Sequence, residues 1–333
     1  MSIAIRSFAK LNLGLKIGPA RADGFHQLRT IYQTIVLHDV VRVEVQSGSG
    51  IEIRCNHPRV PLDESNTCYQ AAGRVLKAAK ASAKVIIEIE KRLPVQGGLG
   101  AGSSNAVATM LGLERALEIN LSATEKLRIA AAIGSDVPLF LIGGTVLGMG
   151  RGEEVYPLPD LPCMHLVVVT PPIAVSTPKA FAQWDSLVAG EAALTGAGAA
   201  GTIDKFGQAL DAWLSEGVFS RAVSASEPAS GVPAVGGDRA ETPLLDLVRA
   251  GIENDFERVV FPEYPDLREV KRVLQREGAR YASLSGSGST LYGVFGTGEE
   301  AQAAATRMSA VGHAAVATTT LTREEYWQAV TSG

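Results

Sequence analysis

Residues 94–106 read Pro94-Val-Gln-Gly-Gly-Leu-Gly-Ala-Gly-Ser-Ser-Asn-Ala106, which places four glycines and two serines within eight residues. The alternating segment Val85–Glu90 before this stretch predicts a strand, and the spacing of Asn105–Leu117 after it predicts a helix. Glycine lets the backbone approach a ligand closely, and free N–H groups at a helix N-terminus attract anions. The stretch therefore predicts a phosphate-binding loop. The alternative is an ordinary turn in which a serine caps the helix.

Two common phosphate motifs do not match this loop. A Walker A loop requires Lys followed by Ser or Thr after its second glycine, and no lysine lies between Val95 and Asn105. A dinucleotide fingerprint requires an acidic residue at the end of the next strand, about 20 residues on. The chain after Leu117 instead predicts another helix, opened by Ser122. The loop is therefore a phosphate cradle of another kind, and a dinucleotide-dependent oxidoreductase is disfavoured.

Composition excludes several classes of protein. The chain has 333 residues, 46% hydrophobic and 20% charged, which is typical of a globular protein with a substantial core. The net charge of −4 without a basic block argues against nucleic acid as a partner. Three cysteines without a CxxC pair indicate neither a disulfide framework nor a zinc site, so we expect a cytoplasmic protein. The longest apolar run, 129–149, contains Asp136 and Pro138, which argues against a membrane span.

The remaining pattern alternates strands and helices. Ile3–Ile17 predicts a strand, and Leu28–Val45 predicts two strands separated at His38-Asp39. Further predicted elements are a helix over 66–81, a helix over 124–133, strands over 139–147, 164–170 and 291–295, and helices from Thr177 and over 264–278. This order predicts an α+β protein. We place one domain at 1–155 and a second at 156–333, with the Ala/Ser/Gly/Pro-rich residues 222–241 as a mobile insert.

Three side chains are candidates for chemistry. Lys10 and Asn12 lie two residues apart and share one face of the first strand. Asp136 is the one acid in a long apolar stretch and follows a predicted helix. A lysine on a strand is usually solvated, and an aspartate after a helix can simply cap the loop, so both structural alternatives stay open. A second glycine/serine loop, Ala282–Thr290, precedes a strand.

Three stretches together resemble a known family. Ala9–Leu15 followed by Arg21–Leu28 resembles the first motif of the 4-diphosphocytidyl-2-C-methyl-D-erythritol kinases. Residues 94–106 resemble the phosphate loop of the wider GHMP kinase superfamily, and Leu284–Thr290 resembles its third motif. The motifs occur in the family's order and span nearly the whole chain. The resemblance implies a two-domain GHMP kinase-like fold with mixed sheets, packed helices and the glycine-rich loop at a helix N-terminus.

The resemblance also implies a reaction. The γ-phosphoryl group of ATP would pass to the 2-hydroxyl of 4-diphosphocytidyl-2-C-methyl-D-erythritol, in the methylerythritol phosphate route to isoprenoid precursors, with Mg²⁺ accompanying the ATP. Asp136 would act as general base, Lys10 as its electrostatic partner, and Asn12 would orient the substrate hydroxyl. The partners would be these two small molecules, and the chain would be a monomer or a homodimer.

Most of the binding residues lie in the same motifs, and Phe181 and Asn66 are added from outside them. Phe25 would stack on the cytosine, His26 would hydrogen-bond the base edge, and Phe181 would supply the opposite face. Asn66 would reach the nucleotide base, or would cap its helix instead. The second loop would meet the substrate phosphates through Gly286, Ser287 and Gly288, or would pack the domains together. The ATP site would comprise Pro94, Gly97, Gly98, Leu99, Gly100, Ala101, Gly102, Ser103 and Ser104, with Ser103 or Ser104 as a possible metal ligand.

The sequence departs from the family pattern at three points. Phe25 stands where tyrosine is more common, Gln96 and Ala101 replace loop glycines, and the region 188–241 is long. Another superfamily member, such as a homoserine or mevalonate kinase, would share the glycine loop but not the Asp23-Gly24-Phe25-His26 arrangement. A nucleotide-binding protein without catalysis would not need both Lys10 and Asp136.

Overall fold

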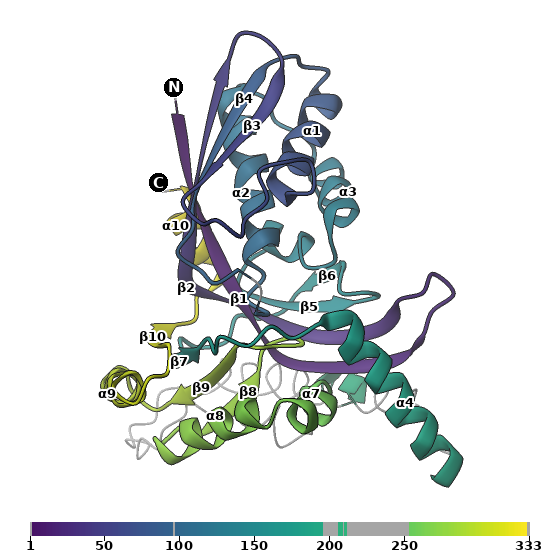
Figure 1. Cartoon of the computed structure of the whole chain (residues 1–333). Helices are drawn as coiled ribbons and strands as arrows, with labels where there is room; N and C mark the ends of the chain where they lie inside the picture. Colours follow the sequence, from purple (N-terminus) through teal and green to yellow (C-terminus); the bar gives the residue numbers. More distant parts are fainter. Residues whose placement is uncertain (1, 96, 196–205, 209, 212–252, 332–333) are drawn as a thin grey trace, which may run out of the picture.

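The computed structural model describes residues 2–95, 97–195, 206–208, 210–211 and 253–331. Two sheets organise the chain, one of six strands in the order β3-β4-β2-β5-β6 with β1 paired to β2, and one of four in the order β10-β7-β9-β8 (Figure 1). The strands are β1 (Ser2–Ala20), β2 (His26–Gln46), β3 (Gly50–Cys55), β4 (Lys84–Glu90), β5 (Thr145–Met149), β6 (Glu154–Pro157), β7 (His165–Val169), β8 (Tyr281–Leu284), β9 (Leu291–Phe295) and β10 (Ala315–Thr319). The predicted α+β class is confirmed.

The long hairpin of β1 and β2 forms part of the six-stranded sheet and also packs against the four-stranded sheet (Figure 1). We expected two strands in place of β2, and this prediction is wrong. The pairing instead shifts register, since Phe8 pairs with His38 and Ala9 with Ile35, so a bulge absorbs the irregularity. Asp39 can remain in the strand because its buried carboxylate accepts hydrogen bonds from the N–H groups of Arg92 and Leu93.

Two helices, α1 (Thr67–Ala79) and α2 (Ala101–Ala116), cover one face of the six-stranded sheet, and α3 (Ala123–Ile133) packs against them (Figure 1). Helix α2 begins four residues earlier than predicted, because the end of the glycine/serine stretch is already its first turn. The strand predicted over 139–147 is also wrong. A 3-10 helix, η1 (Pro138–Leu141), occupies its first half, and Gly143 and Gly144 with positive φ separate that helix from β5.

The second sheet packs against α7 (Glu257–Glu263), α8 (Pro265–Arg276) and α9 (Gly298–Ala310). The first half of α4 (Thr177–Thr195) packs in the same core through Ala180 and Trp184, and its far end extends outward (Figure 1). Helix α10 (Arg323–Thr331), which we did not predict, packs into the apolar core between the six-stranded sheet and its helices. Its Tyr326 hydroxyl donates a hydrogen bond to the Phe140 carbonyl at 2.7 Å. The expected domain boundary at 155 lies inside β6, and the predicted insert at 222–241 lies outside the described residues.

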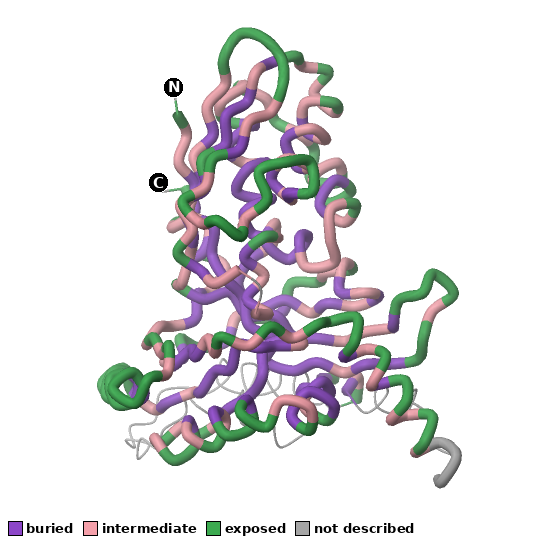
Figure 2. The backbone as a smooth tube through the Cα atoms, viewed as in Figure 1, coloured by how far each residue is buried: buried purple, intermediate pink, exposed green. Residues whose placement is uncertain are grey.

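The middle of the hairpin is buried on both faces (Figure 2). Leu11 and Leu13 of β1 belong to an apolar cluster that also includes Leu166 and Tyr292 of the second sheet. Burial here extends to the polar residues, because Lys10 and Asn12 are each only 2% exposed. The hairpin therefore carries an ammonium group and an amide into the interior, where only specific partners can compensate for lost water.

No helix in the described part of the chain combines the length and the apolarity that crossing a membrane requires. All three cysteines, Cys55, Cys68 and Cys163, are free.

Candidate active site

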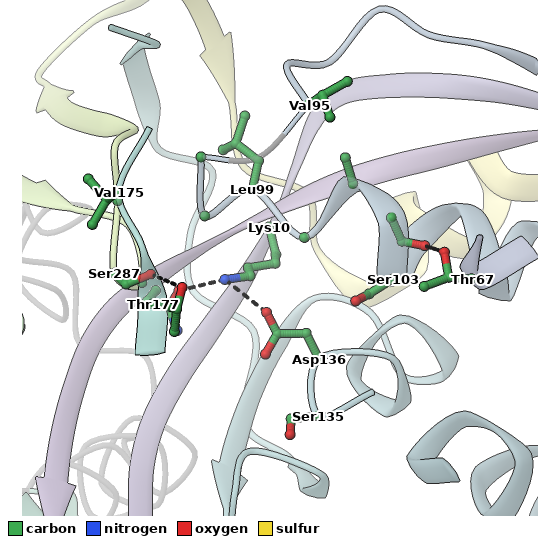
Figure 3. A pocket seen from close by; sticks show the side chains of 18 of the residues that line it. Lys10, Thr67, Val95, Leu99, Ser103, Ser135, Asp136, Val175, Thr177 and Ser287 are labelled. Carbon is green, nitrogen blue, oxygen red and sulfur yellow. Dashed lines mark hydrogen bonds and ion pairs between the residues drawn. The ribbon is translucent and has the colours of Figure 1, made fainter. Parts of the chain in front are cut away.

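A cavity of about 970 Å³ lies where the two glycine-rich loops, the hairpin and the start of α4 come together. Figure 3 shows Lys10 and Asp136 pointing toward each other within it, with Ser103 on one side and Ser287 on the other. Every site residue predicted from the sequence lines this cavity except Ser104. Sequence positions separated by up to 278 residues, from Lys10 to Gly288, are thus brought into one site.

Ser104 faces away from the cavity. Its side chain is buried and lies 2.8 Å from the hydroxyl of Ser7 on β1. The early start of α2 explains the difference, because successive helical residues point about 100° apart and only Ser103 is turned toward the cavity. Of the two predicted hydroxyl groups, Ser103 is therefore the one placed for a ligand.

The N-terminus of α2 opens onto the cavity. Gly100 is its N-cap, with a left-handed backbone, and no described side chain caps this helix. The serine-capped turn that we considered as an alternative is therefore not the arrangement seen. An uncapped helix start presents N–H groups and the positive end of the helix dipole, which together favour a phosphate group.

The two glycine-rich loops touch each other. The Thr290 N–H donates to the Gly97 carbonyl at 3.0 Å, and the Ser285 hydroxyl donates to the Gly98 carbonyl at 3.0 Å. Gly98 has φ +87°, and a Cβ there would overlap the Ser285 carbonyl oxygen. Asn254, which the motifs did not identify, holds the second loop from behind, since its amide donates to the carbonyls of Leu284 and Gly286 at 2.8 Å each.

A polar cluster sits on the cavity floor. Lys10 Nζ lies 3.2 Å from Asp136 Oδ2 and donates to Asn12 Oδ1 at 2.6 Å (Figure 3). The Asn12 amide in turn donates to Thr30 Oγ1 at 2.8 Å, so its orientation is fixed. The Lys10 side chain is 3% exposed, whereas that of Asp136 is 33% exposed. The carboxylate can therefore be reached from the cavity while its cationic partner stays protected from water.

Tyr32 is a member of this cluster that we did not predict. Its hydroxyl donates to Asp136 Oδ1 at 3.0 Å, and its ring centroid lies 5.5 Å from Lys10 Nζ. Burial, reinforced by the nearby Asp136 carboxylate, raises the pKa of Tyr32 well above its ordinary value. Tyr32 pairs with Asn12 across the hairpin, and the bulges in that pairing conceal the relationship from sequence spacing.

The far end of the cavity is aromatic. Phe25 is 49% exposed, and the guanidinium of Arg151 lies 4.8 Å from its ring centroid. His26 Nε2 lies 2.7 Å from Asp185 Oδ1, and its ring stacks on Phe181 with centroids 4.8 Å apart at 9°. One face of Phe181 is thus covered by the imidazole rather than open toward Phe25 as we expected.

Asn66 acts as the N-cap of α1. Its Oδ1 accepts a hydrogen bond from the Cys68 N–H at 2.8 Å, and its Nδ2 donates to the Pro61 carbonyl at 2.6 Å. The residue borders the cavity, but both polar ends of its side chain are engaged. Of the two roles left open above, the helix cap is the one seen.

Comparison with known proteins gives the family. Residues 66–144 match GHMP kinases N terminal domain, and residues 241–314 match GHMP kinases C terminal. The chain is 33% identical to 4-diphosphocytidyl-2-C-methyl-D-erythritol kinase of Acaryochloris marina over 91% of this chain and 90% of that protein. The protein of that name from Moorella thermoacetica is 34% identical over 96% of this chain and 99% of its own. The chain belongs to this family.

Solved structures agree with that assignment. A crystal structure of 4-(cytidine 5'-diphospho)-2C-methyl-D-erythritol kinase superposes on this kinase with a TM-score of 0.69 and 29% identity, covering 96% and 99% of the two chains. Homoserine kinase from Cytophaga hutchinsonii, at 17% identity and TM-score 0.64, shares the fold. The predicted two-domain GHMP kinase-like fold is confirmed, as is an ATP-dependent small-molecule kinase. The oxidoreductase and non-catalytic alternatives are set aside.

Proposed function

We propose that this kinase transfers the γ-phosphoryl group of ATP to the 2-hydroxyl of 4-diphosphocytidyl-2-C-methyl-D-erythritol, in the methylerythritol phosphate route to isoprenoid precursors. The observation that carries the proposal is one continuous cavity, which joins the phosphate loop, the Lys10–Asp136 pair and the aromatic end at Phe25. A nucleotide donor and a cytidine-containing acceptor would meet at the centre of such a cavity. Relatives named for this substrate, 33% and 34% identical over most of the chain, support the same assignment.

Asp136 is the proposed general base. It would accept the proton of the 2-hydroxyl as that oxygen attacks the γ-phosphorus, and ADP would leave on the opposite side. Lys10 would hold the carboxylate in place and offset negative charge on the transferring group. Their 3.2 Å separation and the greater exposure of the Asp136 side chain, 33% against 3% for Lys10, support this division of roles. Asn12, fixed between Lys10 and Thr30, would orient the attacking hydroxyl.

ATP would place its phosphates against the N-terminus of α2. The glycines leave room for the phosphates, and the first-turn N–H groups would donate to their oxygens. Mg²⁺ would neutralise charge on the triphosphate. Among the described residues, no three His, Cys, Asp or Glu side chains gather to hold a metal. The cavity-facing hydroxyl of Ser103 suits an ion held mainly by phosphate oxygens, so Ser103 is the proposed protein ligand.

The cytosine would bind at the aromatic end. Phe25 would stack on the base, with Arg151 supporting the ring from its other side. His26 would hydrogen-bond the base edge, and because Asp185 engages Nε2, the nitrogen left for the base is Nδ1. Phe181 would then serve to hold the imidazole, on which it stacks. Gly286, Ser287 and Gly288 would meet the substrate phosphates.

The test is ADP release by purified protein with ATP, Mg²⁺ and 4-diphosphocytidyl-2-C-methyl-D-erythritol, with homoserine and mevalonate in parallel. We expect turnover with the cytidine substrate alone, and its loss in Asp136→Asn while ATP still binds. Turnover with homoserine or mevalonate instead would contradict the role assigned to Phe25 and His26. Full activity of Asp136→Asn would contradict the role of the base.

A further inference from the structure

Tyr32 lies beneath the catalytic pair but belongs to none of the motifs that define the family resemblance. We propose that Tyr32 is a positioning residue: its hydroxyl fixes one oxygen of Asp136, so that the other oxygen stays beside Lys10 and the carboxylate faces the substrate hydroxyl. The inference rests on the proposed function, because it assumes that Asp136 takes the proton.

The two oxygens of Asp136 have different partners. Tyr32 donates to Oδ1 at 3.0 Å, and Lys10 lies 3.2 Å from Oδ2. A carboxylate offers about four acceptor positions, so two contacts leave capacity for the substrate. With both oxygens held, the carboxyl group cannot rotate freely about its last torsion. An unsupported aspartate on a loop would rotate freely about this torsion, and restricting the rotation favours a reactive geometry.

The space around Tyr32 is matched to a tyrosine. A Cβ on Gly148 of β5 would overlap the ring at Cε2, and a Cβ on Gly152 would lie 2.5 Å from the hydroxyl oxygen. The ring also borders Lys10, whose Nζ lies 5.5 Å from the ring centroid. Gly148 therefore leaves room for the ring, and Gly152 leaves room for its hydroxyl. This packing argument is independent of the hydrogen bond to Asp136.

The hydroxyl can act only as a donor to the carboxylate. Tyr32 is 2% exposed, and its raised pKa keeps the phenol protonated throughout the range in which the enzyme would work. It therefore neither competes with Asp136 for the substrate proton nor adds a second negative charge to the site. Its effect is confined to where the carboxylate sits.

The first experiment compares Tyr32→Phe with Tyr326→Phe. Both variants remove a buried hydroxyl that is hydrogen-bonded, but the Tyr326 hydroxyl bonds the Phe140 carbonyl in the core and not Asp136. We expect Tyr32→Phe to lower kcat by roughly 10- to 100-fold with little change in KM for either substrate. Tyr326→Phe should lower the melting temperature and leave kcat unchanged. Equal kcat in Tyr32→Phe and wild type would overturn the inference.

A double-mutant cycle separates this inference from the proposed function. In the Asp136→Asn background, where residual turnover is followed at high enzyme concentration, Tyr32→Phe should cause no further loss of kcat, because the side chain that it positions can no longer act as a base. The same fold loss in both backgrounds would overturn the inference while leaving the base intact. Full activity of Asp136→Asn would overturn the proposed base, and the inference with it.

Discussion

The hydroxyl of Ser285 donates a hydrogen bond to the carbonyl oxygen of Gly98 and so joins two glycine-rich loops that lie 187 residues apart in the chain. The phosphate loop is therefore not supported by its own strand and helix alone. Ser285 is completely buried, and the N–H of Thr290 adds a second bond to Gly97. The shape of the proposed ATP site thus depends on the second half of the protein.

Gly98→Ala should damage this contact. The new methyl group would overlap the Ser285 carbonyl, and φ +87° is unfavourable for any residue with a Cβ. We expect a lower melting temperature and an affinity for ATP reduced by about tenfold or more, measured by calorimetry. Gly73→Ala is the matched control, because its Cβ would lie 3.7 Å from Ile51 and alanine should stabilise the helix by up to about 1 kcal/mol. An unchanged ATP affinity in Gly98→Ala would contradict the contact's role.

Lys10→Met keeps most of the buried stem but removes the ammonium group beside Asp136. We expect kcat to fall by at least about 100-fold, as is typical when an electrostatic stabiliser of the transition state is lost. Lys16→Met on the same strand is the control, since Lys16 pairs with Asp255 at 3.0 Å and not with Asp136. Equal losses of kcat in the two variants would show that charge on β1, rather than the Lys10–Asp136 pair, matters.

Phe25→Ala should weaken binding of the cytidine substrate and not of ATP. Loss of a stacking face costs about 1–3 kcal/mol per base, which corresponds to a KM for the acceptor raised roughly 5- to 100-fold. Phe25→Leu keeps an apolar side chain without an aromatic face and should behave like Phe25→Ala. Steady-state kinetics with each substrate varied in turn give both KM values. A parallel rise in the KM for ATP would argue that Phe25 shapes the whole cavity.

Tyr326→Ala tests how far α10 stabilises the apolar core between the six-stranded sheet and its helices. Tyr326 is 2% exposed, and its ring centroid lies 5.6 Å from that of Phe8. Truncation of a buried aromatic residue should lower the free energy of unfolding by about 3–5 kcal/mol, measured by urea denaturation. Tyr156→Ala, at a side chain that is 50% exposed, should change it by less than about 0.5 kcal/mol. Similar values for the two variants would place α10 outside the cooperative core.

Features that depend on neighbouring residues were predictable from the sequence. The glycine/serine loop before a helix, and the shared face of Lys10 and Asn12, follow from local spacing. Asp136 was a candidate because it is the one acid within a long apolar stretch, where a charged side chain is unfavourable without a specific role. Predictions of this kind hold in the folded protein because strand alternation and helix N-terminal chemistry are properties of the backbone itself.

Features that depend on the relative placement of distant segments were not predictable. Tyr32 of β2 bonds Asp136 of the loop after α3, and Asn254 reaches the second loop, each across a tertiary contact. The distinction between Ser103 and Ser104 required the true first residue of α2, and an error of a few residues reverses which hydroxyl faces the cavity. The stacking of His26 on Phe181 likewise has no sequence signature.

The position of α10 bears on how the protein is made. Tyr326 and Val330 are buried in the core built by the first half of the chain, yet the ribosome adds them only after the whole second sheet has been synthesised. Until then, the nascent first half keeps an apolar surface around Phe8 and Phe140 exposed. That half therefore reaches its final packing after translation of α10, and before that the uncovered surface is one that molecular chaperones can bind.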